Sequence, residues 1–288
     1  MTNTCKNLPS GDFPARAGQQ GWRVEDIDFS LLKSELVRDD EQLFYLLVSA
    51  SFVEILADLY ADNLVAHFEG NADAVHWLEH SWKREEVQHG YAFKAYVQAV
   101  WPEFDWERAY AGFAVEYGAV CTVDLLDPSH ALEMAARCVV ETGTSTLYRG
   151  LYDYAREPVL RRLLVNIRSD EVRHYNAFRR YFEECNRQER LGWWPITRAM
   201  LGRALEARDE DAYIAFKHAY TVRHSEKPFD DAAWRAFLRG LRQIVWRHYP
   251  YRMAIKMLLA PIPLGARIKS FVGALMTGVA RLALRAEN

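Results

Sequence analysis

The sequence lacks most of the features that mark common cofactor-binding and scaffold proteins. Its 288 residues include four cysteines and no Cys-x-x-Cys pair, which argues against a disulfide scaffold, a rubredoxin-type iron site and a cysteine-rich zinc site. Neither a glycine-rich dinucleotide fingerprint nor a phosphate-binding loop is present. The 36 basic and 39 acidic side chains leave a formal charge of −3, so the chain also lacks the basic character of a nucleic-acid-binding protein.

Long hydrophobic runs are missing near both ends of the chain. The first 22 residues hold no apolar core segment, so we expect no secretory signal. The uncharged run at 270–280 has 11 residues, whereas a membrane span needs about 20. We expect a cytoplasmic protein with no transmembrane segment, in which this run packs on the protein itself or on a second copy rather than on a membrane. The basic residues that flank the run, and make the helix amphipathic, are Arg267, Lys269, Arg281 and Arg285.

What the sequence does have is repeated helical patterning. Half of its residues are hydrophobic and 26% are charged, which is enough for a sizeable core. No alternating strand pattern or hairpin signal appears, and helix-start signals at Asp40, Asn71 and Ser129 open long apolar segments. The expected helices are 42–68, 71–101, 104–120, one from Ser129 to before Pro158, 159–187, three within 193–248, and a last one after Pro263.

These patterns predict an all-α protein in three parts. Proline and glycine breakers make residues 1–38 an irregular N-terminal segment. Residues 39–187 form a four-helix bundle, and residues 188–288 form a helical C-terminal extension that ends in the amphipathic helix.

Two segments 85 residues apart repeat the same residue types in register. Residues 86–96 read EVQHGYAFKAY and residues 171–181 read EVRHYNAFRRY. Each begins with Glu-x-x-His, and residues three apart lie on the same face of a helix, so each pair can bind one ion from one side. The two pairs are Glu86 with His89, and Glu171 with His174.

Two further glutamates lie in apolar stretches upstream. Glu54 precedes Glu86 by 32 residues, and Glu141 precedes Glu171 by 30. A separation of this length corresponds to part of one helix, a short turn and part of the next helix running back. Each upstream glutamate should therefore lie level with the glutamate of the motif that follows it. An unpaired carboxylate in such a place costs several kcal/mol, roughly, or is forced neutral. Two divalent ions bound by four carboxylates and two imidazoles remove that cost, so the sequence predicts a two-metal site.

The ligand pattern resembles that of the ferritin-like di-iron carboxylate superfamily. Within it the pattern is most similar to the oxidase branch, which includes soluble acyl-carrier-protein desaturases, aldehyde-deformylating oxygenases and ribonucleotide reductase small subunits. The resemblance covers residues 39–187 and implies a ferritin-like bundle with two iron ions, or a manganese–iron pair, and O₂ as co-substrate. The six ligands it implies are Glu54, Glu86, His89, Glu141, Glu171 and His174.

The resemblance also assigns residues around the ligands. Glu85 and Asp170 match acids that accept a hydrogen bond from the far nitrogen of a ligand histidine, the alternative being an ordinary contact between helices. Thr144 matches a catalytic threonine that handles protons during oxygen activation, the alternative being a hydroxyl bonded to its own helix backbone. The chain departs from the desaturases at Gln88, where they carry arginine before the first ligand histidine; the second position is Arg173.

One main hypothesis and two alternatives follow. The main one is an O₂-activating non-haem di-iron oxidoreductase that acts on a hydrophobic or carrier-tethered small molecule. Its pocket would be lined by residues such as Leu47, Ala61 and Phe178, the alternative for each being ordinary packing in the bundle core. Because flavin, nicotinamide and iron–sulfur motifs are missing, it would take electrons from a separate ferredoxin or reductase. The alternatives are a ferritin-like iron-handling or peroxide-scavenging protein, for which Asp58 is the candidate extra carboxylate, and a structural bundle without metal. A radical-storing tyrosine is not expected, because Phe93 stands where reductase small subunits place it.

Overall fold

The computed structural model describes residues 21–121, 126–206 and 210–286. Every regular element in these ranges is a helix, so the predicted all-α class is confirmed. Three short 3₁₀ helices, η1 (Val24–Asp26), η2 (Phe29–Leu31) and η3 (Ser34–Leu36), precede the long helices. They belong to the segment predicted to be irregular, of which residues 1–20 lie outside the described residues.

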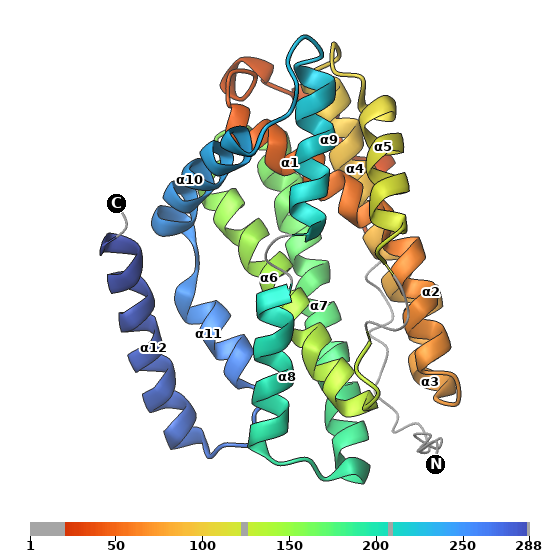
Figure 1. The fold of residues 1–288 in the computed structure, drawn as a ribbon, viewed down its shortest axis with the longest axis vertical. Helices are drawn as coiled ribbons and strands as arrows, with labels where there is room; N and C mark the ends of the chain where they lie inside the picture. Colours follow the sequence, from red (N-terminus) through yellow and green to blue (C-terminus); the bar gives the residue numbers. More distant parts are fainter. Residues whose placement is uncertain (1–20, 122–125, 207–209, 287–288) are drawn as a thin grey trace.

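Four helical segments lie side by side at the centre of the protein (Figure 1). In chain order, the first and second segments pack along each other through helices α1 and α4. The third and fourth segments, helices α6 and α7, pack along each other over most of their length. The segments are α1 (Glu41–Ile55) followed by α2 (Ala57–His67); α3 (Ala72–Trp77), the π-helix η4 (Leu78–Trp82) and α4 (Lys83–Val100); α6 (His130–Tyr154); and α7 (Pro158–Glu189).

Two helices that the sequence predicted to be continuous are interrupted. The helix expected over 42–68 is broken by a turn at Leu56, and the one expected over 71–101 passes through η4. The three helices with predicted start signals begin where the sequence predicted. At each start, a side chain accepts a hydrogen bond from a backbone N–H group that has no partner within the helix. The Asp40 carboxylate accepts from the N–H of Leu43, the Asn71 side chain from Ala74, and the Ser129 hydroxyl from Leu132.

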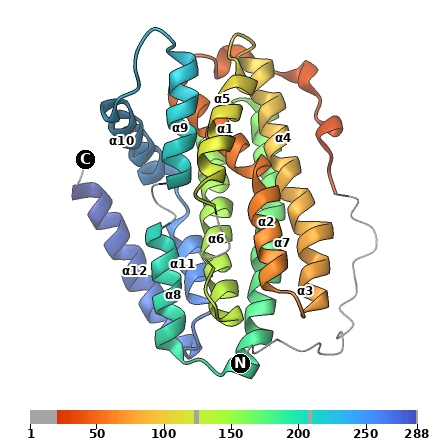
Figure 2. The same cartoon turned by 45° about the vertical axis from the view of Figure 1, so that its right-hand side comes forward.

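The remaining helices surround this centre. Helices α5 and α9 pack together beside α1, whereas α8, α10 and α11 pack on α6. Helix α12 forms an outer layer against α11 and α10 (Figures 1 and 2). Their bounds are α5 (Trp106–Gly118), α8 (Trp193–Glu206), α9 (Glu210–Arg223), α10 (Asp231–His248), α11 (Tyr251–Leu259) and α12 (Ala266–Ala286).

The core consists of two apolar clusters that a polar layer separates. One cluster gathers side chains of α1, α4, α5, α9 and α10, and the other gathers side chains of α2, α8, α11 and the second half of α7. On α6 and α7, Tyr148 and Ile167 belong to the first cluster, whereas Cys138 and Phe178 belong to the second. The residues between them on these helices therefore lie where the two clusters meet.

A glycine allows α1 and α4 to approach closely at this level. A Cβ atom on Gly90 would lie 2.5 Å from both Cγ1 and the backbone nitrogen of Ile55. Such distances are well inside van der Waals contact, so only glycine fits here. This close approach places the residue before it, His89, against α1.

One apolar helical stretch resembles a membrane span by length and composition alone. Residues Glu41–His67 pass that test, but 61% of the tested window is buried inside the protein. The core helix of a globular protein has the same property, so the stretch is only weak evidence for a span.

Candidate metal centre

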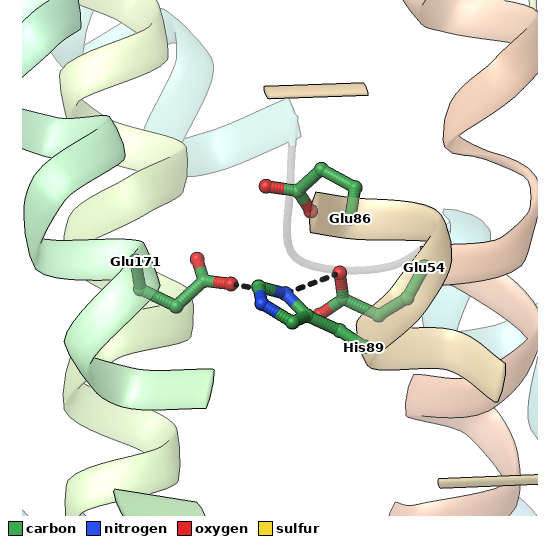
Figure 3. Close-up of side chains that lie close together, drawn as sticks. All are labelled: Glu54, Glu86, His89 and Glu171. Atoms are coloured by element: carbon green, nitrogen blue, oxygen red, sulfur yellow. Dashed lines mark ion pairs between the residues drawn. The ribbon is translucent and has the colours of Figure 1, made fainter. Parts of the chain in front are cut away.

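Six acidic and imidazole side chains meet in the polar layer between the four central segments. They are the six residues that the sequence predicted as ligands, and each is at most 4% exposed. They form two groups of four whose ligand atoms all lie within 4.8 Å of one another. Figure 3 shows the first group, in which Glu54 and Glu171 approach the His89 ring from opposite sides. The groups are Glu54, Glu86, His89 and Glu171, and Glu86, Glu141, Glu171 and His174.

The distances show how each imidazole faces its carboxylates. His89 Nδ1 lies 3.1 Å from Glu171 Oε1 and 3.8 Å from Glu54 Oε2. His174 Nδ1 lies 2.9 Å from Glu86 Oε1 and 3.7 Å from an oxygen of the fourth carboxylate, Glu141 Oε2. The two rings are 5.9 Å apart. Because Glu86 and Glu171 belong to both groups, they lie between the two imidazoles.

Each of the six residues directs one buried atom into the centre without a hydrogen-bond partner. A buried polar atom left unsatisfied costs about 1–3 kcal/mol, so six in one place need an explanation. Bound cations would satisfy all of them, and carboxylate oxygens with imidazole nitrogens suit divalent iron or manganese. The buried Glu and His groups could therefore hold a metal ion. The six atoms are Glu54 Oε2, Glu86 Oε1, His89 Nδ1, Glu141 Oε2, Glu171 Oε1 and His174 Nδ1.

Neutral donors hold three of the four carboxylates in place. Each donor hydrogen-bonds to one carboxylate oxygen, which leaves the other oxygen of that group for the centre. The pairs are Trp82 with Glu141 (3.0 Å between Nε1 and Oε1), Tyr148 with Glu54, and Thr144 with Glu171. Trp82 was not predicted, although its position four residues before Glu86 places it on the same helix face.

Thr144 contacts both a carboxylate of the centre and the backbone of its own helix. Its hydroxyl reaches the Glu171 carboxylate, and it also lies 3.4 Å from the carbonyl oxygen of Val140 on its own helix. The side chain is thus placed beside the centre while remaining tied to α6.

Two acids orient the imidazoles, each acting on the histidine of the other motif. His89 Nε2 lies 3.0 Å from Asp170 Oδ2, and His174 Nε2 lies 2.7 Å from Glu85 Oε2. Arg173 hydrogen-bonds to both acids. Burial opposes ionisation of Asp170, but the hydrogen bond and charge of His89, together with Arg173, lower its pKa to about 2. An ionised carboxylate only accepts, so Nε2 of each ring carries the proton and Nδ1 faces the centre.

The N-terminal segment contributes a residue that the sequence did not reveal. Trp22 Nε1 donates to Asp170 Oδ2 at 2.8 Å, and its indole lies parallel to the His89 ring with 6.1 Å between centroids. Gln88 Nε2 donates to the Trp22 carbonyl at 2.9 Å. The residue that departs from the desaturase pattern therefore anchors this tryptophan. No local motif marks Trp22, because its partners lie far along the chain.

The clustered acids and imidazoles shift one another's pKa values. Burial, and then the charges of Glu171 and Glu54, raise the pKa of Glu86 well above its usual value. Burial and the same kind of repulsion raise the pKa of Glu141. Burial lowers the pKa of His89, but the nearby carboxylates of Asp170, Glu171 and Glu54 outweigh burial and raise that pKa well above its usual value. A metal ion that enters the centre must displace the protons that these groups hold.

Residues expected around the centre have two different placements. Leu47, Ala61 and Phe178, for which ordinary core packing was the alternative to lining a substrate pocket, are fully buried and pack in the two apolar clusters. Asp58, the candidate extra carboxylate, lies at the surface with 65% of its side chain exposed, 3.3 Å from Lys83 Nζ. It does not belong to either group of four.

Comparison of the chain with known protein families, curated proteins and solved structures finds no match. What the protein does must therefore be inferred from the chemistry of the buried cluster.

Proposed function

We propose that the chain is a ferritin-like four-helix-bundle protein whose six buried residues hold two iron ions, and that it is an O₂-dependent oxidoreductase. A hydrophobic or carrier-tethered small molecule would be its substrate. The observation that carries the proposal is the convergence of six unsatisfied ligand atoms in two groups that share Glu86 and Glu171. One ion alone would not explain two imidazoles whose Nδ1 atoms lie nearest to different pairs of carboxylates.

The ligands divide naturally between two ions. Glu54 and His89 would bind one ion, Glu141 and His174 the other, and the two shared carboxylates both. Four carboxylates balance the charge of two divalent ions, which accounts for so many acids in one buried layer. The imidazoles favour iron or manganese over magnesium or calcium, so a manganese–iron pair is the variant of this proposal.

The protein would hold the metal ligands in position, exclude water from the centre and hold a proton close to it. When bound in the reduced state, the ions supply electrons for the reduction of O₂ and hence an oxidant for C–H bonds. Asp170 and Glu85 hold the imidazoles, Trp82 holds Glu141, and the burial of all six ligands keeps the centre away from water. The Thr144 hydroxyl would hold a proton beside Glu171. Electrons would come from a separate ferredoxin or reductase.

The alternative of iron handling or peroxide scavenging has less support. It would call for an additional carboxylate at the centre, and Asp58 pairs with Lys83 at the surface instead. Assembly into a large hollow shell, measured by size-exclusion chromatography, would favour that alternative.

The test is oxygen uptake by the iron-loaded protein. Metal-free protein is loaded with ferrous iron without air and then mixed with O₂ in an electrode cell while its absorption spectrum is recorded. We expect uptake and a spectral change for the natural protein and for Glu183→Ala, which removes an exposed carboxylate from the same helix. We expect neither for Glu171→Ala. Absence of both signals in the loaded natural protein would overturn the proposal.

A further inference from the structure

Helix α12 presents a row of exposed apolar side chains. The row repeats at spacings of three and four residues, so it follows one face of the helix over about 21 Å. Contiguous apolar surface of this kind marks an interaction site. Its members, with the exposed fraction of each, are Ile268 (53%), Phe271 (72%), Leu275 (59%), Val279 (56%) and Leu282 (65%).

The opposite face of α12 packs on the protein and so determines which way the apolar row points. Gly273 faces α11, since a Cβ atom there would lie 3.5 Å from Leu259 and 3.7 Å from Ile255. Lys269 Nζ donates to the carbonyl of Ala260 at 2.7 Å, in the turn between α11 and α12. The apolar row therefore points outward, at the edge of the molecule where Figures 1 and 2 show α12.

The same part of the chain has a charge opposite to that of the rest. Residues 232–286 contain ten lysines and arginines and no acid, whereas the other residues contain 26 basic and 39 acidic side chains. A slightly acidic protein thus carries a strongly basic region. Seven of these basic side chains are exposed on α10, α11 and α12: Arg235, Arg239, Arg242, Arg247, Arg252, Lys256 and Arg267.

We propose that α12, together with the basic helices packed beside it, α10 and α11, binds the surface of an anionic lipid bilayer. Helix α12 lies in the plane of the membrane with its apolar row at the boundary between headgroups and acyl chains, and the basic side chains contact anionic headgroups. The row is too short to span a bilayer but long enough to lie along one. This binding goes beyond the proposed oxidoreductase function and does not rest on it.

An anionic bilayer can bind both the apolar row of α12 and the basic side chains of α10, α11 and α12. Other kinds of partner match only one of these two features. A second copy that packs its α12 on this one would bring together two segments that each carry ten basic residues and no acid, and like charges repel. A nucleic acid would match the charge but would gain little from aliphatic side chains such as Leu275 and Val279.

Vesicle flotation tests the apolar part of the proposal. The full-length protein is mixed with vesicles of phosphatidylcholine alone, or of phosphatidylcholine with phosphatidylglycerol. We expect binding to the anionic vesicles that weakens as salt is added. The double variant Phe271→Ser/Leu275→Ser should bind at least about tenfold more weakly, because it loses two membrane-buried side chains. The control Val115→Ser, at a position that is 79% exposed on α5, should bind normally.

Charge reversal tests the electrostatic part. Arg252→Glu/Lys256→Glu should weaken binding to anionic vesicles by about tenfold, whereas the control Arg84→Glu/Arg108→Glu, also at exposed positions, should not. Circular dichroism checks that each variant folds.

Three results would overturn the proposal. The first is no binding of the natural protein to anionic vesicles. The second is an equal effect of the α12 variant and its Val115→Ser control. The third is a dimer in analytical ultracentrifugation that Phe271→Ser/Leu275→Ser dissociates, because a second copy would then cover the face.

Discussion

Substitution of Glu86 should have opposite effects on stability in the absence and presence of metal. Glu86 belongs to both ligand groups and has a buried, unsatisfied oxygen. In the metal-free protein, Glu86→Gln removes a buried acid from a cluster of like charges. We expect this to raise the free energy of unfolding by about 1–3 kcal/mol. For a chain of 288 residues the melting temperature should rise by roughly 2–5 °C.

In the presence of metal, the natural protein should be more stable than Glu86→Gln. A divalent ion at a hundred times its dissociation constant stabilises a native protein by about 2.7 kcal/mol per site. The natural protein should show that gain, whereas Glu86→Gln loses a ligand shared by both ions and should show little of it. The assay is differential scanning calorimetry with and without Mn²⁺. Glu183→Gln, at an exposed position, is the control. If Glu86→Gln destabilised the metal-free protein and kept the full metal-dependent gain, the carboxylate would be a structural hydrogen-bonding group and the reasoning would be refuted.

Four further predictions concern proton release at the centre, Asp170, Glu133 and Gly90. Because the pKa values of Glu86, Glu141 and His89 are raised, metal binding should release protons and tighten as pH rises. Calorimetry in buffers of different ionisation enthalpy measures the release, and no proton release would contradict this prediction. Asp170→Asn should weaken metal binding by about 10–100-fold in a chelator competition assay with the fold intact, and unchanged affinity would count against its role. Glu133→Gln should destabilise the protein by about 3–5 kcal/mol in urea unfolding, with metal stoichiometry unchanged, because buried Glu133 accepts from Arg137 Nε at 2.7 Å. Gly90→Ala should cost about 1–3 kcal/mol and weaken metal binding, because its Cβ would lie 2.5 Å from Ile55 and push α1 from α4; an unchanged melting temperature would contradict this.

The sequence could predict the buried cluster because its signals are local. A spacing of three residues places glutamate and histidine on one helix face, and a carboxylate such as Glu54 in an apolar stretch needs a partner wherever the helix packs. Helix starts were predictable for the same reason, since Asp40 and Asn71 bond to N–H groups within the next turn.

What the sequence could not predict depends on contacts between distant residues. Trp22 lies 148 positions from Asp170, its hydrogen-bond partner, in a segment without helical periodicity. The turn at Leu56 and the π-helix before α4 have no composition that distinguishes them from continuous helix. Periodicity shows that α12 has an apolar face, but only its packing on α11 shows that this face remains exposed.

Counting bound iron tests the central claim most directly. Metal-free protein is incubated with excess ferrous iron without air, separated from unbound metal and analysed for iron per chain. We predict about two irons per chain for the natural protein and a clear loss for Glu171→Ala, which removes a shared carboxylate. A natural protein that retains neither iron nor manganese, or a Glu171→Ala variant that retains as much as the natural protein, would contradict a two-metal centre.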